Sequence, residues 1–178
     1  EDVEKVLRMC PSGRQTALFS ATMPPPIQRL AEGYMYDPVT VRITPKTLTV
    51  DAIAQAFVEV PAREKSARLV ELLKIEEPEQ AIIFCRTKFE VDEVTQALQG
   101  RGYPSEALPG DLAQPMRDRV LARFRAGTAT LMVATDVAAR GLDVEHISHV
   151  INYSLPGDVD SYVHRIGRTG RAGRAGEA

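Results

Sequence analysis

Residues 80–85 read QAIIFC, an apolar run without the alternation expected of a half-exposed strand. Such a strand is buried on both faces, as in parallel sheets that helices cover. The next segment, 88–99, changes to helical spacing, with Val91, Val94 and Leu98 on one face. The same change of period recurs along the chain, with strands expected at 105–108, 130–134 and 149–152 and helices at 63–76, 113–125 and 159–166. We therefore predict an α/β fold in which a parallel sheet is flanked by helices on both faces, in three α/β/α layers.

The amino-terminal segment has its own pattern. Helices are expected at 3–10 and 27–34, and strands at 15–20 and 39–43. After residue 43 the apolar periodicity ends and Thr, Pro, Lys and Asp become frequent, a composition typical of a linker. The predicted organisation is a remnant of one domain at 1–43, a linker at 44–52 and a second domain at 53–178.

The composition excludes several classes of function. The chain carries 22 basic and 24 acidic residues, a formal charge of −2, so no overall basic field draws it to nucleic acid or to an anionic membrane. Any site for a polyanion must be local. No apolar run is long enough to span a bilayer, and the first residues do not resemble a signal peptide. Cys10 and Cys85 lack metal-ligand spacing and fit a reducing compartment, for which we expect the cytoplasm.

Residues 164–171, HRIGRTGR, indicate a phosphate site. Arg165, Arg168 and Arg171 recur at a spacing of three, with glycines between them. The guanidinium group is a fixed positive charge whose fork of donors fits phosphate oxygens, and glycine lets the backbone approach a ligand. A solvated basic tail is the alternative, but such tails are seldom interrupted by glycine at regular intervals.

Polar residues follow several of the predicted strands. The carboxyl ends of parallel strands meet at one edge of a sheet, where ligands bind in such folds. Each of these residues alone is explained as a solvated cation or a helix cap, but together they favour contacts to a sugar-phosphate backbone. The candidates are Arg86, Thr87, Gly110, Gln114, Arg117 and Thr135.

Five segments in order resemble motifs of the DEAD-box RNA helicases. Residues 134–143 (ATDVAARGLD) and 164–171 resemble two motifs of the second RecA-like domain of that family. Residues 82–88 (IIFCRTK) resemble its first motif there, and Gly110-Asp111 the next. Ser20-Ala21-Thr22 resembles the motif that ends the first RecA-like domain.

This resemblance implies a role for each matched residue. Arg168 and Arg171 would be arginine fingers that reach the γ-phosphate of ATP, with His164 in the same catalytic set. Gly141 and Asp143 would hold the ribose, and Arg165 would belong to the nucleotide site. Arg165 and His164 would also link that site to Ser20 and Thr22, and Phe84 would pack against the arginine segment. The RNA backbone would be contacted by the strand-end residues Arg86, Thr87, Gly110, Gln114, Arg117 and Thr135.

The resemblance also implies partners. The sequence contains neither a GxxxxGK[ST] loop nor an Asp-Glu-Ala-Asp segment, the elements that hold the phosphates and Mg²⁺. We therefore expect a fragment that hydrolyses no ATP alone and relies on a first RecA-like domain of the same parent to bind Mg²⁺. Pro109 stands where the family often has His, which puts one RNA contact in doubt. We also expect self-association through apolar faces of the 1–43 remnant.

Other functions stay open from the sequence. The chain could be an RNA-backbone clamp without ATPase activity, or part of a DNA-acting motor of the same superfamily. The arginines could also bind an acidic protein surface, although a protein partner would not need the glycines between them.

Overall fold

The structure is a computed structural model of the 178-residue chain. It describes residues 2–20, 23–42, 53–139, 142, 144, 147–170 and 175–178. The chain divides into two compact units, Glu1–Thr44 and Pro45–Ala178, and each is described by itself. The predicted linker, 44–52, lies outside the described residues.

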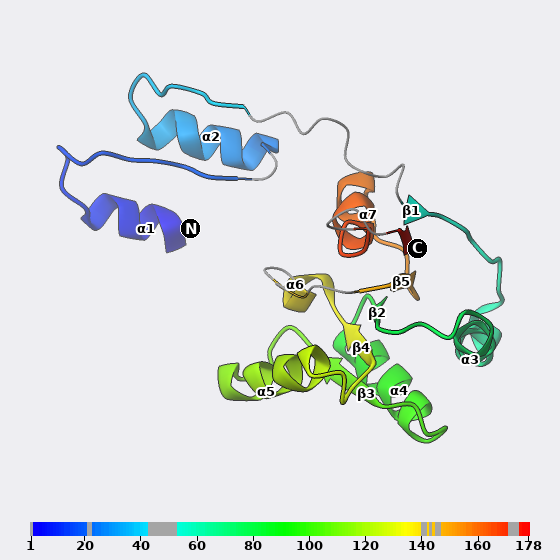
Figure 1. The fold of residues 1–178 in the computed structure, drawn as a ribbon. Helices are drawn as coiled ribbons and strands as arrows, with labels where there is room; N and C mark the ends of the chain where they lie inside the picture. Colours follow the sequence, from blue (N-terminus) through cyan, green and yellow to red (C-terminus); the bar gives the residue numbers. More distant parts are fainter. Residues whose placement is uncertain are drawn as a thin grey trace. The chain divides into compact units, whose positions relative to one another are not determined.

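In the described residues of the first unit, 2–20 and 23–42, the helices are α1 (Asp2–Met9) and α2 (Pro25–Tyr34) (Figure 1). Proline starts α2, where a missing N–H costs no intrahelical hydrogen bond. The strands expected at 15–20 and 39–43 do not form within the described residues. A strand is stable only when its backbone pairs with a neighbour, and the described part of this unit contains no strand for either to pair with. No described side chain of this unit is buried.

The second unit is built on one parallel sheet of six strands, in the order β1-β6-β5-β2-β4-β3. The strands are β1 (Ile53–Ala54), β2 (Ala81–Phe84), β3 (Ser105–Leu108), β4 (Leu131–Ala134), β5 (His149–Asn152) and β6 (Gly176–Glu177). β2 lies between β4 and β5 and is buried along its whole length. The prediction from QAIIFC, a strand covered on both faces, is confirmed.

Helices connect the strands. They are the 3-10 helix η2 (Ala62–Glu64), α3 (Lys65–Glu76), α4 (Lys88–Gln99), α5 (Gln114–Arg125), α6 (Asp136–Ala139) and α7 (Val159–Ile166). Side chains cap two of them: Thr87 Oγ1 accepts a hydrogen bond from Glu90 N, and Asp158 Oδ1 accepts one from Ser161 N.

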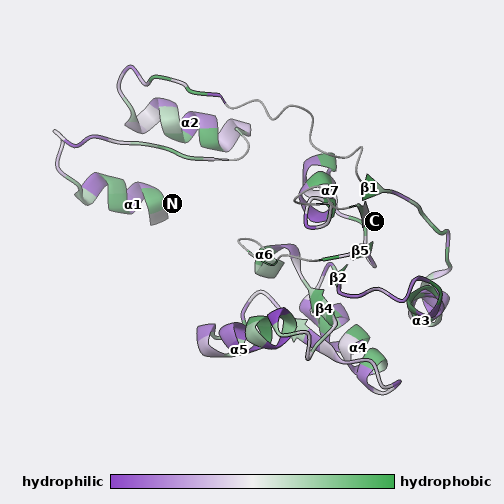
Figure 2. Ribbon diagram, in the orientation of Figure 1, coloured by the Kyte–Doolittle hydropathy of each residue, from purple (hydrophilic) through white to green (hydrophobic). Residues whose placement is uncertain are grey.

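Two cores pack against the two faces of the sheet. On one face of the sheet, Ile82 and Phe84 of β2 pack in a cluster with Phe124 of α5. On the other face, Ala81 and Ile83 pack with residues of α3 and α4. This alternation within β2 follows from the two-residue period of a strand. Figure 2 shows the apolar colouring of the central strands β2 and β4. The three-layer α/β/α architecture is therefore as predicted.

The structure differs from the prediction in a few places. The helix α6 was not expected as an element, and the short strands β1 and β6 pair with each other. Helical spacing puts Met116 inward, but its side chain is 45% exposed because it lies in the first turn of α5, ahead of the part that packs on the sheet. In the described part of the chain no helix is long and apolar enough to cross a membrane.

Candidate nucleotide and nucleic-acid site

The strand ends gather as predicted. Phe84, Leu108 and Ala134 are register partners across β2, β3 and β4, and Asn152 of β5 pairs with Phe84. The residues that follow these four strands therefore emerge at one edge of the sheet. This places Arg86, Thr87, Gly110 and Thr135 together at that edge.

Glu90 organises the turn between β2 and α4. Its carboxylate accepts hydrogen bonds from Arg86 N at 2.8 Å and from Ser154 Oγ at 2.9 Å, while its own N–H is capped by Thr87. Partial burial acts to raise the pKa of Glu90, but the hydrogen bonds from Arg86, Ser154 and Thr87 outweigh it and the pKa lies below its ordinary value. The turn is therefore held in one conformation, with the Arg86 side chain exposed.

Gly110 and Thr135 lie side by side just beyond the ends of the neighbouring strands β3 and β4. A Cβ at Gly110 would lie 3.5 Å from Thr135 Oγ1 and 3.5 Å from Val137 Cβ, so glycine leaves room beside the threonine. Thr135 Oγ1 is buried and has no hydrogen-bond partner among the described residues. A buried hydroxyl without a partner is costly, so this atom is suited to a ligand that supplies the partner.

The expected residues of α5 have partners within the protein. Gln114 Nε2 donates to Asp118 Oδ1 at 2.8 Å, one turn along the helix. Arg117 Nη1 donates to Ala138 O at 2.7 Å and so ties α5 to α6. Beside them, Lys88 and Asp111 form an exposed ion pair at 2.6 Å, and the hydrogen bond from Lys88 lowers the pKa of Asp111.

Arg165 is held by contacts within the protein. Its side chain is only 3% exposed. Nε and Nη2 bind the two carboxylate oxygens of Asp136 at 2.6 and 2.7 Å, and Nη1 donates to Asn152 Oδ1 at 3.0 Å and Ser154 O at 2.6 Å. The guanidinium also lies 4.9 Å from the centre of the Phe84 ring. Arg165 thus joins α7 to the ends of β2, β4 and β5.

This network was not predicted from the sequence, because an aspartate directly after a strand, such as Asp136, is usually a turn or cap residue. The sequence does contain an indication that Arg165 is buried and paired. Tyr162, Arg165 and Ile166 share one helical face, and an arginine on an apolar face needs a carboxylate partner. The expected packing of Phe84 against the arginine segment is observed.

The rest of the arginine segment runs back along the sheet. His164 is exposed. Arg168 is half-buried and its Nη1 donates to Leu142 O at 3.2 Å. Thr169 Oγ1 lies 2.6 Å from Ile147 O and 2.9 Å from Ser148 O, next to the start of β5. The segment therefore extends from the carboxyl edge, at Arg165, toward the opposite edge.

Several expected residues cannot be placed at this site. Gly141, Asp143, Arg171 and Thr22 lie outside the described residues. Ser20 belongs to the first unit, and it has an interaction of its own within the chain.

Comparison with known proteins identifies the class. Residues 64–173, more than half of the chain, match the family model described as "Helicase conserved C-terminal domain". The chain is 52% identical over 168 residues to the DEAD-box ATP-dependent RNA helicase CshA of Geobacillus kaustophilus, covering 94% of this chain and 36% of that protein. It is 51% identical to the protein of that name from Bacillus subtilis, over 94% of this chain and 34% of that protein. The chain spans about a third of the length of these curated relatives.

Solved structures agree. A DEAD box protein from Methanococcus jannaschii is 41% identical, with a TM-score of 0.68, over 99% of this chain and 47% of that one. Saccharomyces cerevisiae Dbp5, solved bound to RNA and ADP BeF3, is 34% identical, with a TM-score of 0.82, over 98% of this chain and 46% of that one. The chain therefore belongs to the helicase C-terminal domain family, within the DEAD-box RNA helicases. Its sheet is RecA-like, as in those proteins.

Proposed function

We propose that this chain supplies one side of an RNA-binding groove and the arginine fingers of an ATP-dependent RNA helicase. The observation that carries the proposal is the Thr135 hydroxyl, buried without a partner between the strand ends that bear Thr87 and Gly110. The start of α4 adds N–H groups that favour an anion. A phosphate of an RNA backbone would satisfy that hydroxyl.

RNA is the proposed ligand because of the relatives. The proteins that resemble most of this chain are named RNA helicases, and one solved neighbour was bound to RNA. Arg86, Thr87, Gly110, Gln114, Arg117 and Thr135 are the proposed contacts. Gln114 and Arg117 would have to exchange or share their present hydrogen bonds to Asp118 and Ala138 when RNA binds.

In the proposed ATP site, Arg168 and Arg171 stabilise charge on the transferred γ-phosphoryl group, with His164 beside them. An arginine finger is worth on the order of 10³–10⁵ in rate. Gly141 and Asp143 hold the ribose; Leu142, between them in the sequence, accepts the hydrogen bond from Arg168. Arg165, already bound to Asp136, acts by fixing α7 rather than by reaching the nucleotide.

The proposal divides the work between two domains. Residues 1–43 form the end of a first RecA-like domain, which binds Mg²⁺ and the phosphates, and 44–52 link it to 53–178. Ser20 and Thr22 couple that first domain to His164. The fragment alone hydrolyses no ATP, because it carries only half of the active site. In the parent, closure of the two domains on RNA completes both sites and opens a short duplex.

The test is ATP turnover by the parent protein, with and without single-stranded RNA. We expect turnover that RNA stimulates, and a loss of at least 10³-fold in Arg168→Ala, as for other arginine fingers. RNA binding by Arg168→Ala should persist, since the proposed RNA contacts are elsewhere. RNA binding without turnover in the unchanged parent would replace the proposal with a clamp. Stimulation by DNA alone would replace it with a DNA-acting motor.

A further inference from the structure

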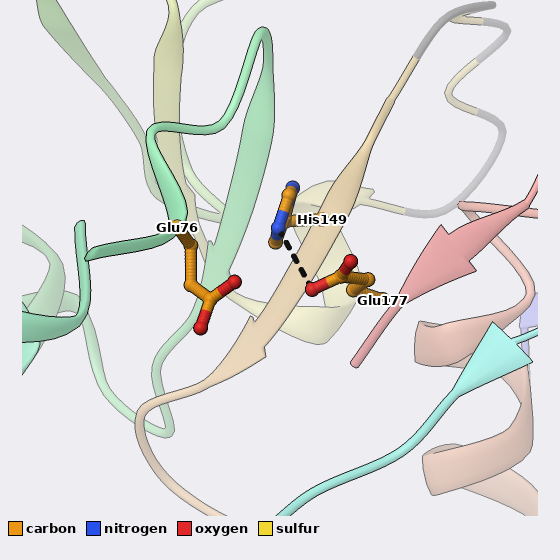
Figure 3. A group of neighbouring side chains, drawn as sticks. All are labelled: Glu76, His149 and Glu177. Carbon is orange, nitrogen blue, oxygen red and sulfur yellow. Dashed lines mark ion pairs between the residues drawn. The ribbon is translucent and has the colours of Figure 1, made fainter. Parts of the chain in front are cut away.

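A second cluster of ligand-type side chains lies away from the strand ends described above. Glu76 ends α3, His149 begins β5 and Glu177 lies in β6, register partner of His149. One ligand atom from each of the three lies within 4.8 Å of the other two. Figure 3 shows the His149 ring between the two carboxylates. This is the edge where β5 starts, opposite the proposed RNA groove.

Ser148 is the hydrogen-bond partner of the His149 ring. Ser148 Oγ lies 2.9 Å from Gln80 O, to which it can donate, and it accepts a hydrogen bond from Gln80 N. His149 Nδ1 lies 2.9 Å from the same Oγ, and when the hydroxyl proton goes to Gln80 O, Nδ1 is the donor of that contact. In a neutral ring this leaves a lone pair on Nε2, the state in which a histidine binds a metal.

The nearest charged group to Nε2 is the Glu177 carboxylate. Nε2 is buried and has no hydrogen-bond partner among the described residues, and Glu177 Oε2 lies 3.2 Å away, at the distance of an ion pair with a positive charge on the ring. A lone pair on Nε2 and a carboxylate oxygen repel each other, and either a proton on Nε2 or a metal ion bound to both atoms relieves that repulsion. Glu76 and Glu177 are both exposed, so each carboxylate can turn toward such a cation.

We propose that Glu76, His149 and Glu177 bind a divalent transition-metal ion of the zinc class. Zinc–nitrogen and zinc–oxygen bonds of about 2.1 Å put neighbouring ligand atoms roughly 3.4 Å apart in a tetrahedron. The 3.2 Å between His149 Nε2 and Glu177 Oε2 already fits, and Glu76 has to move by a rotamer adjustment. An imidazole ligand favours zinc over magnesium or calcium, which prefer oxygen alone.

The site has room for an ion and its water. A hollow of about 380 Å³ is lined by residues of β1, β5 and β6, among them His149 and Glu177. The three ligands come from three elements that meet only in the folded chain. Metal binding would therefore join the end of α3 to β5 and the short strand β6, and would stabilise the folded state.

Calorimetric titration of the 178-residue chain with ZnCl₂, backed by the absorption spectrum with Co²⁺, tests the proposal. We expect one saturable equivalent of Zn²⁺ and an unfolding temperature that rises with its concentration. Glu177→Gln and Glu76→Gln should each weaken binding at least tenfold, whereas the matched control Glu79→Gln, an exposed glutamate outside the cluster, should bind as the unchanged chain.

Two results would overturn the proposal. One is the lack of saturable binding by the unchanged chain at Zn²⁺ concentrations up to about 100 μM. The other is unchanged affinity in both glutamine variants, which would put the ion elsewhere, such as on the Cys10 thiol. Circular dichroism without metal verifies that each variant is folded. If Glu177→Gln does not fold, the Zn²⁺ affinity of Glu76→Gln decides the test, because Glu76 is exposed at a helix end and its replacement should leave the fold intact.

Discussion

Replacing Gly176 by alanine should weaken the attachment of the arginine segment to the sheet. A Cβ on Gly176 would lie 2.5 Å from Gly170 N and 2.7 Å from Thr169 Cγ2, and closer still to Thr169 Oγ1. Real Cβ atoms do not approach other atoms this closely, and one of these neighbours is backbone. Thr169 is 2% exposed and its hydroxyl bonds the carbonyls that precede β5. The methyl group must therefore displace either β6 or Thr169.

The expected loss follows from these contacts. Overpacking a well-filled site costs about 1–3 kcal/mol, and a buried hydroxyl that loses its partner costs about 1–3 kcal/mol. Because relaxation relieves part of each, we expect Gly176→Ala to lower the free energy of unfolding by about 2–4 kcal/mol. The unfolding temperature should fall by roughly 5–12 °C for a domain of this size. Urea and thermal unfolding, followed by circular dichroism, measure both.

Gly157→Ala is the matched control, because a Cβ at Gly157 would meet nothing within 4 Å. Its stability should stay within about 0.5 kcal/mol of the unchanged chain. Adding Thr169→Ala to Gly176→Ala removes Oγ1 and Cγ2 but not Gly170 N, so the pair should be less destabilised than the sum of the single changes. A Gly176→Ala chain as stable as Gly157→Ala would refute the reasoning.

Three further predictions concern single groups. Asp136→Asn should lower the free energy of unfolding by about 2–3 kcal/mol, because it removes the charge that pairs with buried Arg165 while Asp136 itself is 41% exposed; urea unfolding measures it. The pKa of Glu90 is lowered in the folded chain, so its carboxylate contributes stability above its unfolded pKa of about 4.3. That contribution should disappear as the pH falls through the folded pKa, and Glu90→Gln should remove this part of the acid dependence of unfolding. Burial raises the pKa of Cys85 to about 12, so a thiol reagent at pH 8 should modify half-buried Cys10 in the native chain and Cys85 only after unfolding.

Each of these has a control and an opposing result. The control for Asp136→Asn is Asp92→Asn at an exposed position of α4, which should change the free energy of unfolding by no more than about 0.5 kcal/mol. If Asp136→Asn has an equally small effect, Arg165 does not need the negative charge of Asp136. Glu93→Gln, also exposed on α4, should keep the acid dependence that Glu90→Gln loses; identical pH profiles would exclude the proposed role of Glu90. Rapid native labelling of Cys85, counted by mass spectrometry, would show that the core opens more readily than its packing indicates.

The elements with strong local signals were predictable from the sequence. The helix α4 and the strands β3 and β5 have the predicted bounds, because each signal lies within a dozen neighbouring residues: an apolar period, a Thr87 cap or a closing glycine. The strand ends bearing Thr87, Gly110 and Thr135 also follow, since parallel strands must end at one edge. The strands expected at 15–20 and 39–43 are not observed in the described residues. Their β propensity is a local signal, but a strand also needs a neighbouring strand to pair with.

Only the tertiary structure decided which distant residues meet. The sheet order brings His149 beside Glu177, and α3 adds Glu76. The path of α7 places Arg165 against Asp136 and so forms a partly buried ion pair between residues 29 positions apart. Glycine is required at position 176 because Thr169 and Gly170 N lie where its side chain would be, which no local pattern indicates. Periodicity is a property of neighbours in the sequence, whereas these contacts depend on how separate elements pack. The sequence by itself therefore determined the helices, the strands and the polar residues at the strand ends, and the packing determined which distant side chains contact one another.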